Sequence, residues 1–394
     1  MCDKAMNVWI DLGHIPQYNF YKPVILELAA DGHKVYVTYL RRGRMPKIIQ
    51  KELGDERNVS LACIGRHRMN RWSVLLEANL LRNVQLFLWK IGKKIDVILS
   101  NGYQTAMVGW LFGIPSYSFD DDPETIDYRP KLWFNKKTHY CIYEYQGKRR
   151  LSPKAIVLPV LKEWAYLSPT IFRPNAEVLR QYGVRPREYV FLREVSVGTM
   201  NYVGQHAGAI YAVKDLIPKD KKVLLSLEEK DKRSMYPEDW TLLQEPLEDV
   251  HSLIYYSCGL MSSGDSMARE AAMLGVPAYY LGVRHSMPAN KTAHKVAGLQ
   301  SEDSMDVKEW IKQLSLPSDE LDRQQEEKRN SISAEFIDIS LYMLDTIYQT
   351  KKKREITVTD SGNGQSKTYL IPYGSRLKVQ DGDMLEAGDE ITEG

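Results

Sequence analysis

Cysteine and long apolar runs are scarce in this sequence of 394 residues. Its four cysteines, Cys2, Cys63, Cys141 and Cys258, are scattered without a Cys-x-x-Cys spacing. That pattern excludes a disulfide framework and a cysteine zinc site, and it is typical of a reducing cytoplasm. No apolar run is long enough to span a bilayer, and the first residues lack the basic start and apolar centre of a secretory signal. We therefore expect a cytoplasmic protein.

Net charge is also nearly absent, at +2, but the charges are unevenly distributed. Residues 1–160 contain 24 Lys and Arg against 15 Asp and Glu, whereas residues 355–394 contain 3 against 8. The basic N-terminal part suggests an anionic partner, such as a phosphorylated acceptor or a membrane surface; a solvated basic face is the alternative. The composition is 43% hydrophobic and 26% charged, as in globular proteins. Since the chain exceeds the length of one typical core, we expect two domains.

Short apolar runs alternate with helical patterns along the first 160 residues. The runs predict strands, and the helical patterns predict helices at 18–30, 72–92 and 104–112; the strands are 7–12, 34–40, 59–64, 97–100, 114–119, 140–143 and 155–158. Strand–helix–strand units of this length are βαβ crossovers, which form a parallel sheet with helices on both faces. Prolines at 159, 169 and 174 then indicate an inter-domain connection at 161–174.

A second alternating block follows the connection and predicts a second doubly wound domain at 175–350. Its predicted strands are 188–193, 222–227, 260–261 and 278–281, and a shorter unit ends at 242–245. Its predicted helices are 203–216, 247–257, 306–314 and 319–349. Residues 356–394 change character, with short strand-like segments between glycine turns, and predict a small all-β module. The expected fold class is therefore α/β, with two Rossmann-like domains, the first at 1–160, and a β appendage.

Residues 259–282 form the most informative motif, in which a strand, a small-residue turn, a helix and a second strand follow one another. The helix begins within Ser262, Ser263, Gly264, Asp265, Ser266 and Met267. The unpaired N–H groups and positive dipole at a helix N-terminus bind phosphates. Leu274-Gly275-Val276-Pro277 ends the helix. An ordinary helix cap is the alternative interpretation.

Other candidate residues follow predicted strands, because ligands gather beyond the carboxyl ends of strands in open α/β sheets. They are His14, Asn101 and the run Asp120–Asp122. His14 is the candidate general base, and Asp11 either orients it or serves as the base instead. The run of aspartates could bind a divalent cation or cap the turn at Pro123; we expect no metal.

A basic segment follows the third predicted strand. Arg66, His67 and Arg68 either receive a phosphorylated or membrane-bound acceptor or belong to a solvated loop. The predicted helix 72–92 carries tryptophans at Trp72 and Trp89 and could touch a bilayer surface. Its apolar residues are broadly spread around the helix, which favours burial against the sheet.

Several strings resemble domain-of-unknown-function family 354, whose members look like glycosyltransferases of the two-domain glycosyltransferase-B architecture. They are Val8–Pro16, Phe20–Pro23 and Asp31–Val35, followed in order by Ile64–His67, Gly113–Pro115, Arg193-Glu194 and Met261–Pro277. The resemblance covers about residues 1–345. Gly264-Asp265-Ser266-Met267 stands where the family has Gly-Gly-Thr-Met, and Arg193-Glu194-Val195 where it has Arg-Pro-Glu. The extra carboxylate of Asp265 would be unfavourable beside a diphosphate unless it faces away or meets a metal.

The resemblance implies a UDP-sugar ligand and a role for several residues. Residues 263–266 would hold the diphosphate and Glu270 the ribose hydroxyls, while Arg193 and Arg284 would neutralise the phosphates. The implied reaction is sugar transfer from UDP to a polysaccharide or lipid-linked acceptor, without a cofactor. The alternatives are a UDP-sugar 2-epimerase and a catalytically degenerate binding protein of the same fold. We also expect peripheral contact with the inner face of a membrane, a homodimer, and no nucleic-acid partner for the main body.

The tail resembles a different protein. Tyr369–Gly374 and Ala387–Gly394 look like a segment of the bacterial RNA polymerase β′ subunit, from its barrel-sandwich part. The tail has glycine–aspartate turns like those of biotinyl domains, but it lacks their Met-Lys-Met attachment site. We interpret it as an appended module that cannot polymerise nucleotides.

Overall fold

The structure is a computed structural model. It describes residues 5–66, 80–197, 204–244, 247, 249–350, 354–359, 362, 364–371, 378–379, 382–386 and 388–391. The chain divides into two compact units, the first comprising residues 1–118, 129–137 and 338–394 and the second residues 119–128 and 138–337. Two sheets of parallel strands and one small antiparallel sheet are present, which confirms the predicted fold class.

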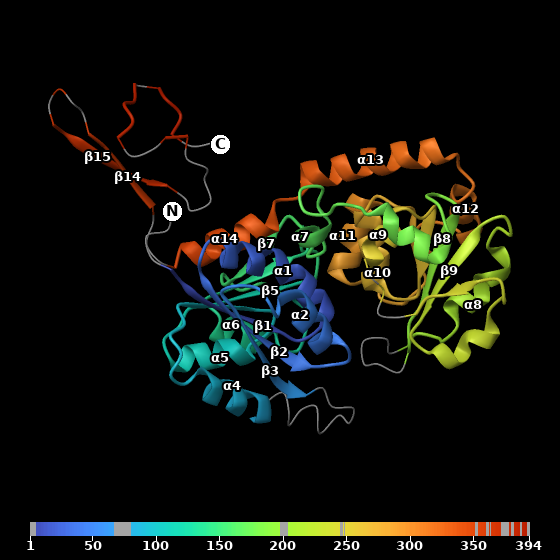
Figure 1. The fold of residues 1–394 in the computed structure, drawn as a ribbon, viewed down its shortest axis with the longest axis horizontal. Helices are drawn as coiled ribbons and strands as arrows, with labels where there is room; N and C mark the ends of the chain where they lie inside the picture. The colour runs from blue at the N-terminus through green and yellow to red at the C-terminus, as the bar shows by residue number, and fades with distance from the viewer. Residues whose placement is uncertain are drawn as a thin grey trace. The chain divides into compact units, whose positions relative to one another are not determined.

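The first sheet has seven strands in the order β3-β2-β1-β4-β5-β6-β7 (Figure 1). Its strands are β1 Asn7–Leu12, β2 Lys34–Arg41, β3 Val59–Arg66, β4 Val97–Ser100, β5 Ser116–Asp120, β6 Lys137–Cys141 and β7 Ala155–Leu158. The helices of this part are α1 Ile15–Ala30, α2 Met45–Leu53, α4 Arg82–Lys90, α5 Gln104–Leu111 and α6 Tyr128–Phe134. The inner strand β1 pairs with β2 and β4 in parallel, and its residues 8–12 are all buried. A parallel strand covered on both faces reads as a continuous apolar run, which is why the sequence predicts it well.

Helices of the first unit cover both faces of the first sheet at the strands β1, β2 and β4. On one face Trp9, Tyr36 and Ile98 pack with Leu86 of α4 and Val108 of α5. On the other, α1 lies beside α14, Ile339–Tyr348, which follows the second unit in the chain (Figure 1). The Tyr348 hydroxyl donates to the Asp31 carboxylate at 2.9 Å. The last long helix therefore belongs to the first unit.

The second sheet has six strands in the order β10-β9-β8-β11-β12-β13. They are β8 Tyr189–Glu194, β9 Lys222–Leu227, β10 Thr241–Leu242, β11 Gly259–Ser262, β12 Ala278–Tyr280 and β13 Gln300–Ser301, and the pairs between neighbouring strands are parallel. Its helices are α7 Trp164–Leu167, η2 Ala176–Tyr182, α8 Ala209–Val213, η4 Lys214–Leu216, η5 Lys230–Met235, α9 Val250–Tyr255, α10 Asp265–Met273, α11 Pro288–Ala297, α12 Val307–Gln313 and α13 Ser318–Glu335.

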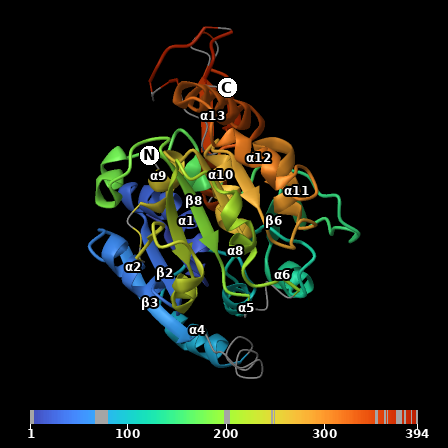
Figure 2. The same cartoon turned by 90° about the vertical axis from the view of Figure 1, so that its right-hand side faces the viewer.

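One apolar cluster of the second unit lies on one face of its sheet. Leu192, Leu225 and Met261 pack there with Ile210 of α8 and Trp310 of α12. Helices α9 and α10 lie beside each other (Figure 2). Because the chain crosses from β8 to β9 through α8 and then returns from β10 to β11 through α9, both faces of the sheet carry helices.

Some predicted elements differ from the structure. The single helix predicted at 319–349 is wrong: it is two helices, α13 and α14, separated at 336–338. Phe336 is extended, and the Asp338 side chain accepts hydrogen bonds from the backbone N–H groups of Ser340 and Leu341, which starts a new helix. The sequence reasoning also missed α2, α6, α11 and β13. Of the predicted helix 72–92, residues 72–79 lie outside the described residues.

The tail contributes one antiparallel hairpin, β14 Arg354–Thr359 paired with β15 Ser366–Ile371. Within the described part of 378–391 no further strand is present, although the sequence suggested short strands there. Among the described helices, none is both long and apolar enough to cross a membrane.

Gly275, directly after α10, offers a test of this packing. Its φ is +76°, and a Cβ there would lie 2.6 Å from the backbone oxygen of Gln325 in α13. Gly113 also has positive φ, +66°, but a Cβ there would meet nothing within 4 Å. We expect Gly275→Ala to lower the free energy of unfolding by more than about 2 kcal/mol and Gly113→Ala by only about 1 kcal/mol, the cost of a left-handed alanine alone. Urea denaturation measures both, and equal losses would contradict the close approach of α13.

Candidate functional site

The turn between β11 and α10 is tied to the end of β8. The Ser263 N–H donates to the Arg193 carbonyl oxygen at 3.0 Å, and the Ser263 hydroxyl accepts from the Val195 N–H at 2.9 Å. The Ser262 hydroxyl accepts from the Gly264 N–H at 2.9 Å. Both serine side chains are fully buried, so their hydroxyls hold the turn. A phosphate at this turn would therefore meet backbone N–H groups at the start of α10 and the partly exposed Ser266 and Met267.

Asp265 is the first residue of α10, and its carboxylate is paired with two arginines. Its Oδ2 lies 3.3 Å from Nη1 of Arg269, one turn further along α10, and 3.0 Å from Nη1 of Arg284. Arg269 also forms an ion pair with Glu163 at 2.8 Å and donates to the Asn290 side-chain oxygen at 2.6 Å. We call Glu163, Asp265, Arg269 and Arg284 the α10 ion cluster. It has two positive and two negative side chains and is neutral as a whole.

Arg269 is the buried centre of this cluster. Its side chain is 4% exposed and those of Asp265 and Glu163 are 3% and 6% exposed, whereas that of Arg284 is 29% exposed. Burial by itself would lower the pKa of Arg269, but the carboxylates of Glu163, Asp265 and Asp121 outweigh it and raise that pKa. The guanidinium is therefore charged, and the carboxylate of Asp265 does not stand uncompensated at the start of α10.

The Asp120–Asp122 run lies in the second unit and is engaged in local contacts. Asp121 forms an ion pair with Lys162 at 2.8 Å. The Asp122 carboxylate accepts from the Glu124 N–H at 2.8 Å, which caps the turn after Pro123. Burial raises the pKa of Asp122, and the neighbouring charge of Asp121 adds to this effect. Among the described residues, no group of three or more His, Cys, Asp or Glu side chains is arranged to hold a metal ion.

Glu270 is buried against two aromatic side chains. Its Oε1 accepts from the Tyr166 hydroxyl at 2.7 Å, and its Oε2 lies 3.5 Å from Nε2 of His251. Burial by itself would raise the pKa of Glu270, but the charge of His251 and the hydrogen bonds from His251 and Tyr166 outweigh it and lower that pKa. Both carboxylate oxygens thus have protein partners, and the predicted contact with a ribose stays a prediction.

Arg193 lies in β8, the strand beside β11. Its Nη1 donates to the Ser226 hydroxyl at 2.7 Å, and its Nη2 forms an ion pair with Glu228 at 2.6 Å. These contacts hold the guanidinium at the carboxyl ends of β8 and β9. Both partners lie in or directly after β9, on the side of β8 away from β11, so the role implied for Arg193 stays a prediction.

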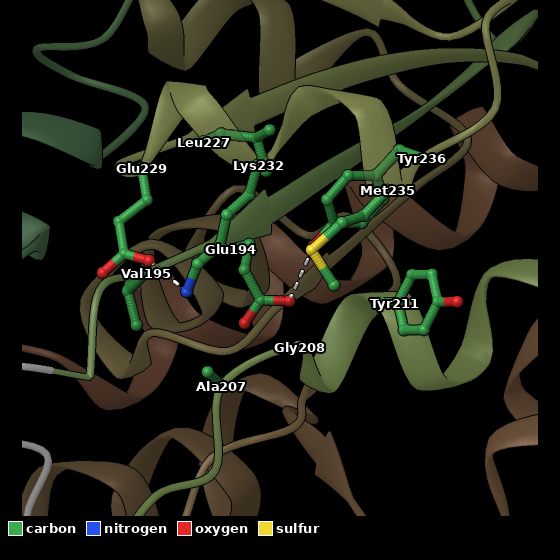
Figure 3. A pocket seen from close by; sticks show the side chains of 10 residues that line it. All are labelled: Glu194, Val195, Ala207, Gly208, Tyr211, Leu227, Glu229, Lys232, Met235 and Tyr236. Carbon is green, nitrogen blue, oxygen red and sulfur yellow. Dashed lines mark hydrogen bonds and ion pairs between the residues drawn. The ribbon is translucent and has the colours of Figure 1, made fainter.

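A pocket of about 90 Å³ opens at the ends of β8 and β9 (Figure 3). The carboxylate of Glu194 stands among the lining residues, and its Oε2 accepts from the Ile210 N–H at 2.7 Å and from the Tyr236 hydroxyl at 3.2 Å. Lys232 and Glu229 form an ion pair at the rim. Val195 joins this pocket to the turn before α10, because it lines the pocket and its N–H bonds to Ser263.

In the first unit, Asp11 is held in a buried network at the end of β1. Its Oδ1 accepts from the Thr38 hydroxyl at 2.6 Å and pairs with Nη2 of Arg82 at 2.7 Å. The Trp9 indole N–H donates to the same Thr38 hydroxyl at 2.8 Å. These contacts fix the Asp11 carboxylate, and they link β1, β2 and α4.

The other predicted residues of the first unit are placed as follows. His14 stands directly before α1, partly exposed, and its carbonyl oxygen accepts from the N–H groups of Gln17 and Tyr18. Asn101 follows β4 and is buried; no donor among the described residues bonds its Oδ1. Arg66 is exposed at the end of β3, and His67 and Arg68 lie outside the described residues.

Sequence reasoning missed Arg269, Glu163 and Lys162, which complete the charge balance around α10. One signal was available for Arg269: it stands four residues after Asp265, the spacing at which helical side chains pair. No such signal exists for Glu163, which is 106 residues away from Arg269 in the chain.

Known structures share this architecture. The UDP-GlcNAc 2-epimerase of Neisseria meningitidis, solved with bound UDP-GlcNAc, matches 88% of this chain and all of its own, with a TM-score of 0.59 and 16% identity. The glycosyltransferase of kitacinnamycin matches 88% of this chain and 99% of its own, with a TM-score of 0.57 and 13% identity. The spinosyn rhamnosyltransferase SpnG, solved with thymidine diphosphate, matches 86% and 99%, with a TM-score of 0.54 and 10% identity. The fold is thus the glycosyltransferase-B architecture.

Sequence comparison matches the tail to a segment of a larger protein. RNA polymerase β′ subunits of Caldanaerobacter subterraneus subsp. tengcongensis and Thermoanaerobacter sp. strain X514 are 69% and 67% identical to this chain over 48 residues. That match is 12% of this chain, and the chain spans about 4% of those subunits. No family model matches the chain, so the likeness to family 354 stays a resemblance.

The contacts in the α10 ion cluster predict that replacing Arg269 destabilises the fold much more than replacing Arg284. We expect Arg269→Ala to lower the free energy of unfolding by about 3–5 kcal/mol, because Asp265 and Glu163 would be left buried with one shared partner lost. Arg284→Ala leaves Asp265 paired with Arg269 and removes a partly exposed charge, so we expect a loss below about 1 kcal/mol. Urea denaturation of the two variants at neutral pH measures the difference. Similar losses would show that the two arginines are equivalent.

Glu270 predicts a pH dependence of stability. Because its folded pKa lies below its ordinary value of 4.5, its ionised form stabilises the fold above pH 4.5, and this contribution is lost as the pH falls through the lower folded pKa. Glu270→Gln should remove that part of the decline. The measurement is the urea midpoint of both proteins between pH 6 and pH 3. If the two midpoints fell in parallel with pH, the predicted contribution of Glu270 would be contradicted.

Proposed function

We propose that the chain is a glycosyltransferase that moves a sugar from a UDP-sugar donor to a polysaccharide or lipid-linked acceptor. The observation that carries the proposal is the neutral α10 ion cluster. At the start of α10 the Asp265 carboxylate is buried and paired with two guanidiniums, so the helix N-terminus keeps its attraction for a diphosphate. The shared glycosyltransferase-B fold supports the proposal, and the bound UDP-GlcNAc of the Neisseria meningitidis epimerase supports UDP as the nucleotide.

Asp265 has a positioning role in this proposal. Its Oδ2 holds Nη1 of Arg284, and the Asn290 side chain donates to the Arg284 carbonyl oxygen at 2.6 Å. The guanidinium of Arg284 is the most exposed member of the cluster. We therefore assign to Arg284 the neutralisation of the leaving diphosphate, with the first N–H groups of α10 sharing the charge. The departure from the family's Gly-Gly-Thr-Met is then compatible with donor binding.

The proposed reaction is a displacement at the anomeric carbon of the donor sugar. The acceptor oxygen forms a bond to that carbon, the bond from the carbon to the diphosphate breaks, and the acceptor proton passes to a base. We assign the base to His14. Asp11 is held by Arg82 and Thr38, which suits a positioning residue better than a base that must accept and release a proton.

Two other functions fit the same fold. A UDP-sugar 2-epimerase would need no acceptor and would produce a new sugar isomer from the donor alone. A degenerate binding protein would bind UDP without turnover. The neutral charge balance around Asp265 weakens the argument for degeneration, since the argument depended on an uncompensated carboxylate.

Calorimetry with UDP tests donor binding at α10. We expect UDP to bind, and we expect Ser266→Glu to weaken binding by at least about tenfold, because it places a negative charge at the helix start. Ser318→Glu makes the same change in the first turn of α13, in the same unit, and should leave binding unchanged. No UDP binding to the native chain would overturn the proposal. Equal effects of the two variants would exclude the start of α10 as the UDP-binding site.

Turnover then separates the three functions. UDP release that depends on an added glycan or lipid-linked acceptor supports the transferase, a new sugar isomer detected by NMR without acceptor supports the epimerase, and binding with neither supports the binding protein. His14→Gln should retain UDP binding and lose about 10²–10⁴-fold in turnover. Full activity in that variant would exclude His14 as the base.

A further inference from the structure

The first unit exposes a set of large apolar side chains on α4 and α5. Leu80, Val84, Leu88 and Ile91 follow one another along α4 and its ends, and Trp110 and Leu111 stand at the end of α5; we call these six residues the apolar surface. Each is between 49% and 60% exposed. The spacing of the α4 residues is three or four, which places them on one side of the helix. Contiguous exposed apolar residues of this kind mark an interaction site.

The exposure is not the result of a poorly packed helix. The opposite side of α4 contributes Leu86, Phe87 and Trp89 to the core of the first unit. The rings of Trp89 and Trp9 lie 4.9 Å apart, and those of Phe87 and Phe112 lie 5.3 Å apart. Helix α4 thus has one apolar side for the core and a second for another partner. The prediction of burial for this helix is correct only for the first side.

The two helices form one continuous surface. Helices α4 and α5 pack against each other (Figures 1 and 2). The ring centres of Trp110 and Phe134 of α6 lie 6.0 Å apart. Trp133 of α6 is 72% exposed. The apolar surface therefore extends toward α6 within the same unit.

The accessible charges of the segments that carry the apolar surface are mostly positive. Segments 80–118 and 129–137 of the first unit contain eight Lys and Arg and one acidic residue, Asp96. Arg82 and Lys131 are buried, which leaves six accessible cations. The Lys90 ammonium lies 3.9 Å from the centre of the Phe112 ring, and that of Lys93 lies 4.6 Å from the Trp89 ring. Lysines of this kind cover an apolar region with their stems and keep the charge at its edge. Asp96 is engaged at the start of β4, where it accepts from the Asn7 N–H at 2.8 Å.

We propose that the apolar surface docks on the face of an anionic lipid bilayer, with Leu88 and Trp110 entering the interface and the lysines meeting lipid phosphates. Exposed Leu and Trp beside Lys are the composition of interfacial helices. Lysine is depleted at protein–protein interfaces, so this composition fits lipid better than a protein partner. The contact is peripheral, since no described helix is able to span a membrane. The inference depends on this surface alone and not on the proposed transferase activity.

Flotation of the full chain with phosphatidylcholine vesicles, with and without phosphatidylglycerol, tests the proposal. We expect binding to the anionic vesicles, weaker binding to the neutral ones, and release by salt. The double variant Leu88→Ser/Trp110→Ser should lose at least about tenfold in vesicle affinity. Lys93→Glu should lose about fivefold or more on anionic vesicles only.

Matched controls keep the result interpretable. Leu341→Ser changes a leucine of similar exposure, 52%, on α14 of the same unit, and Lys308→Glu reverses an exposed lysine on α12; both should bind like the native chain. The melting temperature and UDP calorimetry of each variant show whether the fold and the donor site are intact. Absence of vesicle binding, or equal binding by the double variant, would overturn the proposal. Self-association in light scattering that Leu88→Ser/Trp110→Ser abolishes would assign the surface to a second copy of the chain instead.

Discussion

The need to neutralise one buried guanidinium organises the second unit around the start of α10. Arg269 takes a carboxylate from its own helix, Asp265, a second from Glu163 beside α7, and an amide oxygen from Asn290 of α11. Removing either carboxylate would leave the buried guanidinium with less compensating charge. Three elements are therefore held together where the turn between β11 and α10 stands, and the turn is held to β8 through Ser263.

This constraint changes the meaning of Asp265. Beside an open helix N-terminus its charge would repel a diphosphate, and the replacement of a glycine by an aspartate would suggest a lost function. Paired with Arg269 and Arg284, the carboxylate instead directs a partly exposed guanidinium from the following loop. Because its charge is compensated, the Asp265 carboxylate does not count against diphosphate binding at the start of α10.

The first unit shows a comparable division between core and partner. Arg82 of α4 pairs with Asp11 at the end of β1 and so fixes that helix against the sheet. The opposite side of α4 is exposed and apolar, and it adjoins the exposed end of α5. One short helix thus contributes both to the core of the first unit and to the exposed apolar surface. The tail that contains the β14–β15 hairpin is similar to a short segment of polymerase β′ subunits.

Local sequence patterns account for the parts of this protein that depend on residues close together in the chain. The strands at 7–12, 97–100 and 222–227 agree with the structure, because buried parallel strands are short apolar runs. The motif at 259–282 could also be found locally, since a strand, a small-residue turn and a capped helix are adjacent in the chain. Only the tertiary structure decided which charges meet. Glu163 and Arg269 are 106 residues apart, and no local pattern announces such a pair. It likewise decided that Ser262 and Ser263 use their hydroxyls inside the turn, and that one side of α4 stays exposed, because burial is a property of the whole packed chain and not of any segment.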